Sequence, residues 1–408
     1  MKIGYVIYND RPQSGIIKTQ VISLLKEIKR QAPEIDITLI MYWQPWVAFK
    51  YRKDITNMRN ELSKNDICLK SYPWAIVPCR YFLYKYYLFP LLYYWTYSLF
   101  KFTLSNHYDI LHCRSYFESL MGAALKKQKG WKLIFDMRSL FPEENVTKGE
   151  FKYQDKSFNM WKGFERHIIK SADATIGVSQ PMIDDVLRIN PKSNAILIPC
   201  CVDTATFSLN KLARDKYRRI NGWENKLVVL YEGSLSFSSW NNIKNYIRYF
   251  SFILGIRPDA HFLIITPSKD IDFPTIMNKY GIKNSQYTVK EAKGFELAGW
   301  LSASDIGLQV MSKLPDSHTR LGIKFVEYLS CGLPVIVNSN VGGAARIIKD
   351  KGVGAVIDLE EKDKEIKNIS LLFSSLSQLR NQCITTANEM FSTKVCAQRY
   401  IQIYSSLD

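Results

Sequence analysis

The residues best suited to chemistry lie together in one stretch near the carboxyl end of the chain. Two cations, Arg320 and Lys324, stand within a few positions of one carboxylate, Glu327. The apolar spacing from Ile323 to Ser330 predicts a short helix that begins just after Gly322. The first amide groups of a helix are unpaired and its dipole is positive at that end, so a helix start beside cations is suited to binding phosphate.

The residues that follow predict how this helix is held in place. Gly332 stands where a left-handed residue ends a helix, and Pro334 prevents the helix from resuming. Leu333 to Val337 is a short apolar run rich in β-branched residues, which is typical of a strand buried in a parallel sheet. We therefore expect the helix start to lie at one edge of an α/β sheet.

A second group of candidates belongs to two apolar runs in the first half of the chain. His112 ends the run Tyr108 to His112, Arg114 follows it, and Arg138 follows the run Lys132 to Phe135. An arginine fork binds carboxylate or phosphate at two points, so Arg114 and Arg138 are candidates for holding an anionic group.

Each of these candidates has a structural alternative. Arg138 has three acidic neighbours in sequence with which to form an ion pair, Asp136, Glu143 and Glu144. His112 ends a buried strand, where a histidine is often a satisfied core residue.

Strands and helices alternate along the chain in the order expected of two doubly wound α/β domains. A strand at Ile3 to Ile7, a loop containing Gly15 and a helix at Ile16 to Ile28 open the first domain. A strand at Lys226 to Tyr231, followed by Gly233 and Ser234, opens the second domain. The polar, basic stretch 209–224 between them is typical of a linker, and further strands are expected at 36–41, 174–178 and 262–265.

The stretch GIKFVEYLSCGLPVIVN, followed by VGG, resembles the donor-sugar segment of family 4 glycosyltransferases of the GT-B fold. Glu327 matches the second glutamate of the family motif, which binds the ribose of the nucleotide. The first glutamate falls at Thr319, so this position departs from the pattern. Gly322 and Ile323 match the place where backbone amides approach the donor phosphates.

Two further segments carry the resemblance, and each adds to the site. ILIPCCVDTATF, residues 196–207, matches the segment that ends the first domain, and Gly233 and Ser234 match the turn that binds the donor pyrophosphate. The arginine and lysine that usually follow this turn are replaced by LSFSSW, which makes Arg320 and Lys324 the nearest cations. Gly15 and Glu143 are expected on the acceptor side.

The resemblance implies a GT-B fold with two Rossmann-like domains that face each other across a cleft. Residues 1–208, joined by a C-terminal helix at 387–408, form the acceptor-side domain, and residues 209–386 form the donor domain. The implied reaction transfers a sugar from a UDP-, GDP- or CMP-linked donor with retention of configuration. It uses no cofactor and no metal, and the catalytic candidates are Arg138, Arg114, His112 and Thr319.

Charge and composition point to an anionic partner. Lys and Arg outnumber Asp and Glu by 55 to 38, a net charge of +17, for which the alternative explanation is solubility alone. Residues 81–102 contain seven tyrosines, four phenylalanines and Trp95, with Pro90 near the centre. We expect a pair of interfacial helices on an anionic membrane surface, or alternatively an aromatic helix buried against the sheet.

Together these features predict a cytoplasmic enzyme that lies at the inner face of the cytoplasmic membrane and transfers a sugar to a lipid-linked or glycan acceptor. No nucleic-acid motif is visible, so we do not expect nucleic acid as a partner. Two other functions remain open at this point. One is a GT-B epimerase that acts on a nucleotide sugar, and the other is a non-catalytic partner subunit, since Thr319 replaces a functional glutamate.

Overall fold

The computed structural model describes residues 1–8, 10–12, 14–73, 85–104, 107–237, 240–360 and 362–408. The chain divides into two compact units. Unit 1 comprises Met1–Cys201 and Thr393–Asp408, and unit 2 comprises Val202–Ser392. The boundaries expected from the sequence, 208/209 and 386/387, lie a few residues from these positions.

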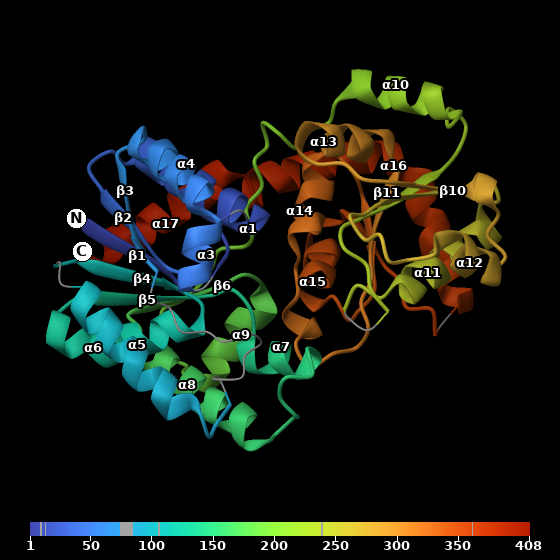
Figure 1. Cartoon of the computed structure of the whole chain (residues 1–408). Coiled ribbons are helices and arrows are strands. Elements are labelled where there is room, and N and C mark those ends of the chain that lie inside the picture. Colours follow the sequence, from blue (N-terminus) through green and yellow to red (C-terminus); the bar gives the residue numbers. More distant parts are fainter. Residues whose placement is uncertain (9, 13, 74–84, 105–106, 238–239, 361) are drawn as a thin grey trace. The chain divides into compact units, whose positions relative to one another are not determined.

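Unit 1 contains a parallel sheet with the strand order β3-β2-β1-β4-β5-β6-β7 (Figure 1). The strands are β1 Lys2–Tyr8, β2 Asp36–Tyr42, β3 Ile67–Tyr72, β4 Ile110–Arg114, β5 Lys132–Met137, β6 Ala174–Gly177 and β7 Ala195–Leu197. Successive strands are added on one side of β1 and then, from β4 onward, on the other. In such sheets ligands bind beyond the carboxyl ends of the two strands at which this order reverses, here β1 and β4.

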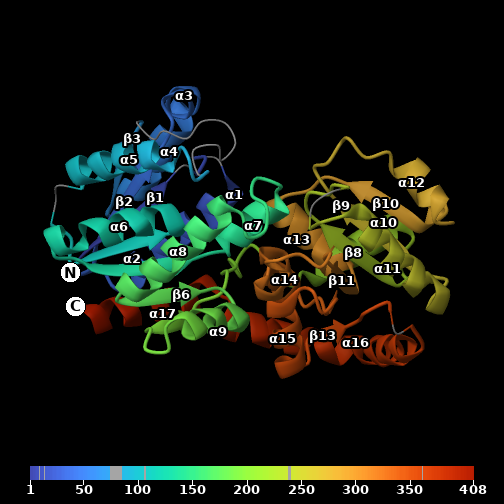
Figure 2. The same cartoon turned by 90° about the horizontal axis from the view of Figure 1, so that it is seen from below.

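Helices cover both faces of this sheet (Figure 2). They are α1 Gly15–Ile17, η1 Lys18–Ile22, α2 Ser23–Gln31, α3 Pro45–Lys50, α4 Arg52–Ser63, α5 Phe89–Thr103, α6 Tyr116–Lys129, α7 Phe141–Thr147, α8 Lys156–Ser171, α9 Gln180–Ile189 and α17 Thr393–Leu407. One hydrophobic cluster joins the sheet to α5, α6 and α8, and a second joins it to α2, α4 and α17. The helix predicted at Ile16 to Ile28 is confirmed, with one π-helical segment, η1, in its middle.

Unit 2 contains a second parallel sheet with the strand order β10-β9-β8-β11-β12-β13. The strands are β8 Val228–Glu232, β9 His261–Ile265, β10 Tyr287–Lys290, β11 Ile306–Gln309, β12 Val335–Val337 and β13 Gly354–Val356. Its helices are α10 Lys211–Asn221, α11 Ile243–Ile256, α12 Phe273–Lys279, η3 Asn284–Gln286, α13 Gly294–Ala303, η4 Ser317–Thr319, α14 Ile323–Ser330, α15 Gly342–Lys351 and α16 Lys362–Met390. The strand order reverses at β8 and β11. The predicted α/β class with two parallel sheets is confirmed.

Four strands were missing from the sequence-based prediction, and they are the edge strands of the two sheets, β3, β7, β10 and β13. Strand β3, with the sequence ICLKSY, lies at the edge of the first sheet and pairs with β2 alone. Only Ile67 and Leu69 in it are buried. An edge strand with few buried positions lacks the continuous apolar run that marks the central strands of a parallel sheet.

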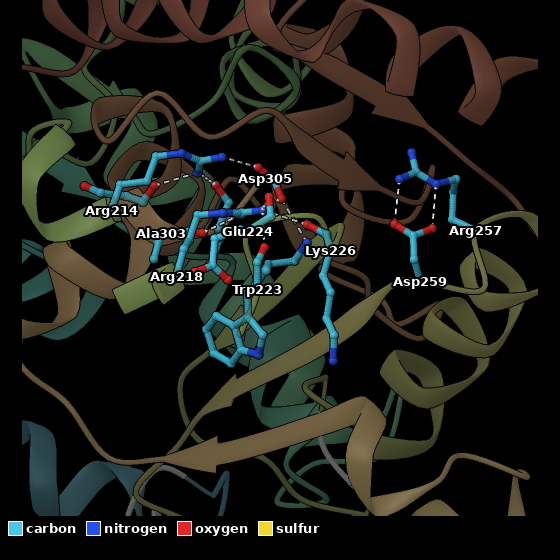
Figure 3. Close-up of polar contacts among 12 residues, drawn as sticks. Arg214, Arg218, Trp223, Glu224, Lys226, Arg257, Asp259, Ala303 and Asp305 are labelled. Atoms are coloured by element: carbon cyan, nitrogen blue, oxygen red, sulfur yellow. Dashed lines mark hydrogen bonds and ion pairs between the residues drawn. The ribbon is translucent and has the colours of Figure 1, made fainter. Parts of the chain in front are cut away.

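The predicted linker 209–224 is wrong, because most of it forms helix α10, which packs against α13. Arg214 and Arg218 on α10 donate to carbonyl oxygens at the carboxyl end of α13 and pair with Asp305, as Figure 3 shows. Arg380 on α16 also contacts Asp305, at 3.2 Å. Arg214 and Arg218 are therefore part of the packing of unit 2, where they pair the last carbonyls of α13, while Lys211, Lys216 and Arg219 are exposed.

The predicted C-terminal helix, residues 387–408, is corrected: this stretch contains the end of one helix and the whole of another. Helix α16 ends at Met390 and α17 begins at Thr393. Helix α17 packs against α2 in unit 1, where the Gln31 amide donates to the Lys394 carbonyl at 3.1 Å. The chain thus returns to its first unit for its last fifteen-residue helix.

The aromatic segment is only partly within the described residues, since positions 81–84 lie outside them. From Lys85 the chain forms a turn, and Pro90 lies in the first turn of α5 rather than between two helices. Proline fits there because the first amides of a helix have no intrahelical partner. The expected pair of helices is thus one helix in the described part. Within that part of the chain, no helix has the length and apolar character needed to cross a membrane.

Candidate active site

Most of the predicted donor residues of unit 2 gather at the carboxyl ends of β8 and β11. Gly322 precedes α14 with φ of 81°, a conformation that favours glycine. A Cβ atom there would also lie 2.4 Å from Nε2 of Gln309, which donates to the Leu321 carbonyl. Only glycine fits this position, and Ile323 then begins the helix. The predicted helix Ile323 to Ser330 is confirmed in full, and Gly332 is left-handed as expected.

Lys324 lies directly against the glycine turn that follows β8. A Cβ atom at Gly233 would be 2.2 Å from both Cε and Nζ of Lys324, and Gly233 has φ of 119°. The Lys324 ammonium donates to the Tyr231 hydroxyl at 3.2 Å and lies 4.9 Å from the centre of that ring. The Tyr231 hydroxyl in turn donates to the carbonyl of Ser234. The turn and the cation are thus held together by one tyrosine.

Glu327 is buried beside a second carboxyl group, Glu232, at the end of β8. The two side chains are hydrogen-bonded to each other. Burial and the charge of Glu232 raise the pKa of Glu327 well above its ordinary value, and burial also raises the pKa of Glu232. Two carboxylates in contact cannot both remain ionised at low cost, so the pair holds a proton between them. Lys324 is their nearby cation, and its own pKa is lowered by burial.

Arg320 and Thr319 lie in the same loop but are engaged by other groups. The Arg320 guanidinium donates to the Asp316 carboxylate, with Nε 2.7 Å away, and lies over the Trp240 ring. Thr319 is buried, and its hydroxyl donates to the Asp316 carbonyl at 3.1 Å. Lys324, rather than Arg320, is therefore the cation that reaches the glycine turn.

His112 of unit 1 lies within a buried polar network and not at the end of its strand. Strand β4 continues to Arg114, and His112 lies within it. The His112 ring packs against the Tyr5 ring, with the two ring centres 4.3 Å apart. Its Nε2 lies 3.4 Å from the Asp136 carboxylate, and its Nδ1 forms a 2.8 Å hydrogen bond with the Tyr404 hydroxyl. Burial lowers the pKa of His112, which is therefore neutral near pH 7. This is the core-histidine arrangement.

Arg138 also belongs to this network. Its Nη1 lies 3.3 Å from Asp136, which also accepts from the Tyr400 hydroxyl of α17 at 3.3 Å. Burial alone would raise the pKa of Asp136, but Arg138 and the bond to His112 lower it below its ordinary value. Pairing with Asp136 was the structural alternative for Arg138. Removal of Arg138 would leave a buried carboxylate without its cation.

Arg114 is the candidate in unit 1 with an unused donor. It ends β4, beside β1, where the strand order reverses, and it is only 7% exposed. Among the described residues, no hydrogen-bond partner is found for its Nη1 or for the hydroxyl of buried Tyr5. An unpaired buried donor is costly, so this position suits an acceptor group supplied by a ligand.

The remaining predicted residues are less closely tied to a site. Gly15 begins α1, and a Cβ atom there would meet nothing within 4 Å. Glu143 forms an ion pair with Lys162 at 3.0 Å, and Ser234 is exposed after β8. Among the described residues, no group of three or more His, Cys, Asp and Glu side chains is arranged to hold a metal.

Three residues at these strand ends were not predicted from the sequence. Glu232 is a single acidic residue beside a glycine, which indicates a site only weakly. Its position at the end of a strand adds to that indication. Glu118 on α6 accepts from the Tyr8 amide at 2.8 Å, and burial raises its pKa to about 8. Ser115 has φ of 87°, which is strained for a non-glycine residue and which no sequence pattern indicates.

Comparisons with known proteins identify the class to which these two units belong. Residues 17–206 match the family described as Glycosyltransferase Family 4, and residues 213–390 match Glycosyl transferases group 1. These ranges correspond closely to the two sheets and their helices. The protein is a glycosyltransferase of the GT-B fold and belongs to family 4.

Solved structures share this fold at low sequence identity. Sucrose-phosphate synthase from Thermosynechococcus elongatus aligns over 100% of this chain and 98% of its own, with 17% identity and a TM-score of 0.70. HepE from Anabaena, in complex with UDP, aligns over 100% of both chains with 14% identity and a TM-score of 0.68. WaaG, a glycosyltransferase involved in lipopolysaccharide biosynthesis, aligns over 98% and 99%, with 15% identity and a TM-score of 0.64. No curated protein sequence matches the chain.

Proposed function

We propose that the protein moves a sugar from a nucleotide-sugar donor to a hydroxyl of a lipid-linked or glycan acceptor, with retention of configuration, in the synthesis of a surface polysaccharide. The observation that carries this proposal is the position of Lys324 in unit 2, against the Gly233 turn and beside Glu327. The structural neighbours support the donor class, since HepE is seen with UDP and with UDP-glucose. WaaG supports a role in surface glycans.

The residues around the Gly233 turn suggest how the donor would react. A departing nucleoside diphosphate accumulates negative charge, and a fixed cation with free helix amides stabilises that charge in the transition state. Lys324 and the start of α14 at Ile323 provide both. We propose that this positive charge takes the place of the missing arginine and lysine after Gly233, and that transfer needs no metal or other cofactor.

A non-catalytic partner subunit is the second candidate, and one observation favours it. Thr319 stands where the family motif has its first glutamate, and its hydroxyl donates to the backbone of the same loop. No carboxylate is then supplied at that position for the hydroxyls of a donor sugar. A chain that binds the donor but transfers nothing to any acceptor would fit this second function.

A thermal-shift screen with UDP, GDP, ADP, CMP and their sugars, in the presence of EDTA, tests the donor assignment. A ligand that binds only the folded state raises the free energy of unfolding, by about 2.7 kcal/mol at a ligand concentration of 100 times the Kd. The melting temperature rises with it. We expect one nucleotide and its sugars to stabilise the protein without a metal. If none of them shifts the melting temperature, the donor site is wrongly assigned. Stabilisation followed by failure to turn over would favour the partner subunit.

We also propose that the enzyme acts at the inner face of the cytoplasmic membrane and contacts its anionic surface through α5. Tyr87, Leu91 and Tyr94 are 64%, 65% and 74% exposed on or just before this helix, although all three are large and mostly apolar. Lys101 lies on the same exposed side. Tyrosine and tryptophan favour the headgroup boundary of a bilayer, and a cation nearby adds attraction to anionic lipid.

The protein is expected to float with anionic vesicles in a density gradient, and the double variant Leu91→Ser/Tyr94→Ser is expected to lose most of this binding. Both side chains are exposed, so the substitutions should leave the fold unchanged. Leu212→Ser on α10 of unit 2, at an 83% exposed position, is the control and should float like the parent. A parent protein that stays at the bottom of the gradient would contradict membrane contact.

A further inference from the structure

A groove in unit 1 lies between α5, α6 and α8, outside the strand ends described above. Its cavity volume is about 800 Å³. The lining residues are Tyr86, Tyr93, Leu120, Lys156, Asn159, Met160, Gly163, Phe164 and His167. Rings and aliphatic side chains make up most of the walls, two basic side chains stand among them, and none of these nine residues carries a carboxylate. A cavity of this size is in the range of small-molecule sites.

Packing between α5 and α8 fixes the shape of the groove. The rings of Phe89 and Phe164 are 4.8 Å apart, and Phe89 also packs edge-on against Trp161 at 5.4 Å. At the other end, the Tyr86 amide donates to the Ser157 hydroxyl at 3.1 Å. These contacts hold the two helices together below the groove while leaving the space above Gly163 open.

Gly163 lines the groove at a position where neither the backbone nor close packing requires a glycine. It lies in the interior of α8, where glycine lowers helix stability relative to alanine. Its φ is not positive, and a Cβ atom there would meet nothing nearer than Arg166 Nη2 at 3.9 Å. Neither the backbone nor a neighbour requires glycine, and any larger side chain would project into the groove. The effect of this glycine is to keep the groove open.

The groove adjoins the exposed aromatic side of α5. Tyr86 and Tyr93 line it, while the adjacent residues Tyr87 and Tyr94 are exposed to solvent. At its Tyr86 end lies Lys156, the first residue of α8, whose ammonium is 5.9 Å from the Tyr86 ring centre. An apolar channel with a cation at one end matches a hydrocarbon chain that carries a phosphate.

We infer that this groove binds the hydrocarbon chain of a long-chain lipid phosphate, with the phosphate at Lys156. The inference rests on the proposed function and deepens it, since this lipid would be the carrier end of the acceptor. A chain leaving the bilayer beside α5 enters the groove along Tyr93, Met160 and Phe164, where its apolar surface is removed from water. The positive charge of the exposed Lys156 favours the phosphate there, whereas the amide end of α8 is already capped by Asp155, whose carboxylate accepts from the Phe158 amide at 2.7 Å.

The groove is tested with dodecyl phosphate at submicellar concentration, by isothermal titration calorimetry on the full chain. We expect saturable binding to the parent, loss of binding in Gly163→Leu and at least tenfold weaker binding in Lys156→Met. Gly255→Leu is the matched control, because Gly255 is also in a helix, α11 of unit 2, with nothing within 4 Å of its Cβ position. Dodecanol should bind the parent and Lys156→Met alike, and inorganic phosphate should bind neither.

Equal binding of dodecyl phosphate to the parent and Gly163→Leu would overturn the inference. A change of oligomeric state in Gly163→Leu, seen by sedimentation with no lipid effect, would instead mark the groove as an interface between copies of the chain. The rise in melting temperature with nucleotide separates this test from that of the proposed function. Gly163→Leu should show the same rise as the parent, because Gly163 is not among the donor residues. A failed nucleotide screen with intact dodecyl phosphate binding would reject the donor site alone.

Discussion

Replacement of Asp305 by asparagine is expected to lower the free energy of unfolding by about 3–5 kcal/mol, the range for breaking a buried ion pair by removing one partner. Asp305 is 8% exposed and pairs with Arg214 and Arg218 (Figure 3). Its carboxylate also contacts Arg380 at 3.2 Å. It also accepts from the Val228 amide at the start of β8. The variant leaves three largely buried guanidinium groups without a carboxylate. Urea unfolding of the parent and the variant measures the difference.

The exposed pair Arg257–Asp259, also drawn in Figure 3, is the matched control. Asp259→Asn is expected to change stability by no more than about 1 kcal/mol, because an exposed pair is screened by water. The pKa of Asp305 is lowered in the folded state, chiefly by Arg214 and Arg218 acting against burial. Its ionised form therefore stabilises the fold above pH 4, roughly, and that contribution is lost as the pH falls through the lowered pKa. Equal effects of the two variants at pH 7 would contradict the structural role of Asp305.

Glu327→Ala is expected to weaken binding of the nucleotide found in the thermal-shift screen by roughly 10- to 100-fold in Kd, the equivalent of losing one hydrogen bond to a charged group. Glu327 is 8% exposed and lies beside Lys324 and Glu232, near the carboxyl end of β8. The family motif assigns its position to the ribose. Calorimetric titration of both proteins with the same nucleotide measures the loss.

The stability of Glu327→Ala separates lost binding from lost structure. Glu327 is buried against the half-buried Glu232, so removal of Glu327 leaves Glu232 to pair with Lys324 and should not destabilise unit 2. Glu389→Ala, at an exposed position on α16, should bind the nucleotide as the parent does. If Glu327→Ala also binds with the parental Kd, the donor residues have been placed wrongly.

The fold was predictable at strands that are buried on both faces of the sheet, because their sequences are continuous apolar runs. Val228–Glu232 and Val335–Val337 are apolar runs, and the glycines that follow or precede them mark the turns. Edge strand β3 and helix α10 were not recognised, for related reasons. The first has few buried positions, and the second buries its arginines through ion pairs, so that its sequence resembles a solvated linker.

The candidate site was predictable residue by residue within one segment, but not across segments. Gly322, Lys324 and Glu327 follow one another on one helix, whereas Glu232 reaches them only through the register of β8 with β11. In the same way, the network of His112 depends on Tyr400 and Tyr404 from the far end of the chain. Contacts between distant segments depend on topology, which no local spacing encodes.

The return of the chain to unit 1 has a consequence for its synthesis. Residues 1–201 leave the ribosome first, but helix α17, which packs on α2 and bonds to His112 and Asp136, is made only after the whole of unit 2. Domains usually fold in the order in which they emerge. Here one core of the first unit is covered only once α17 has been made, so a nascent chain that ends at Met390 has all but two residues of unit 2 but lacks a helix of the first unit. An error near the carboxyl terminus would therefore harm the amino-terminal half of the enzyme.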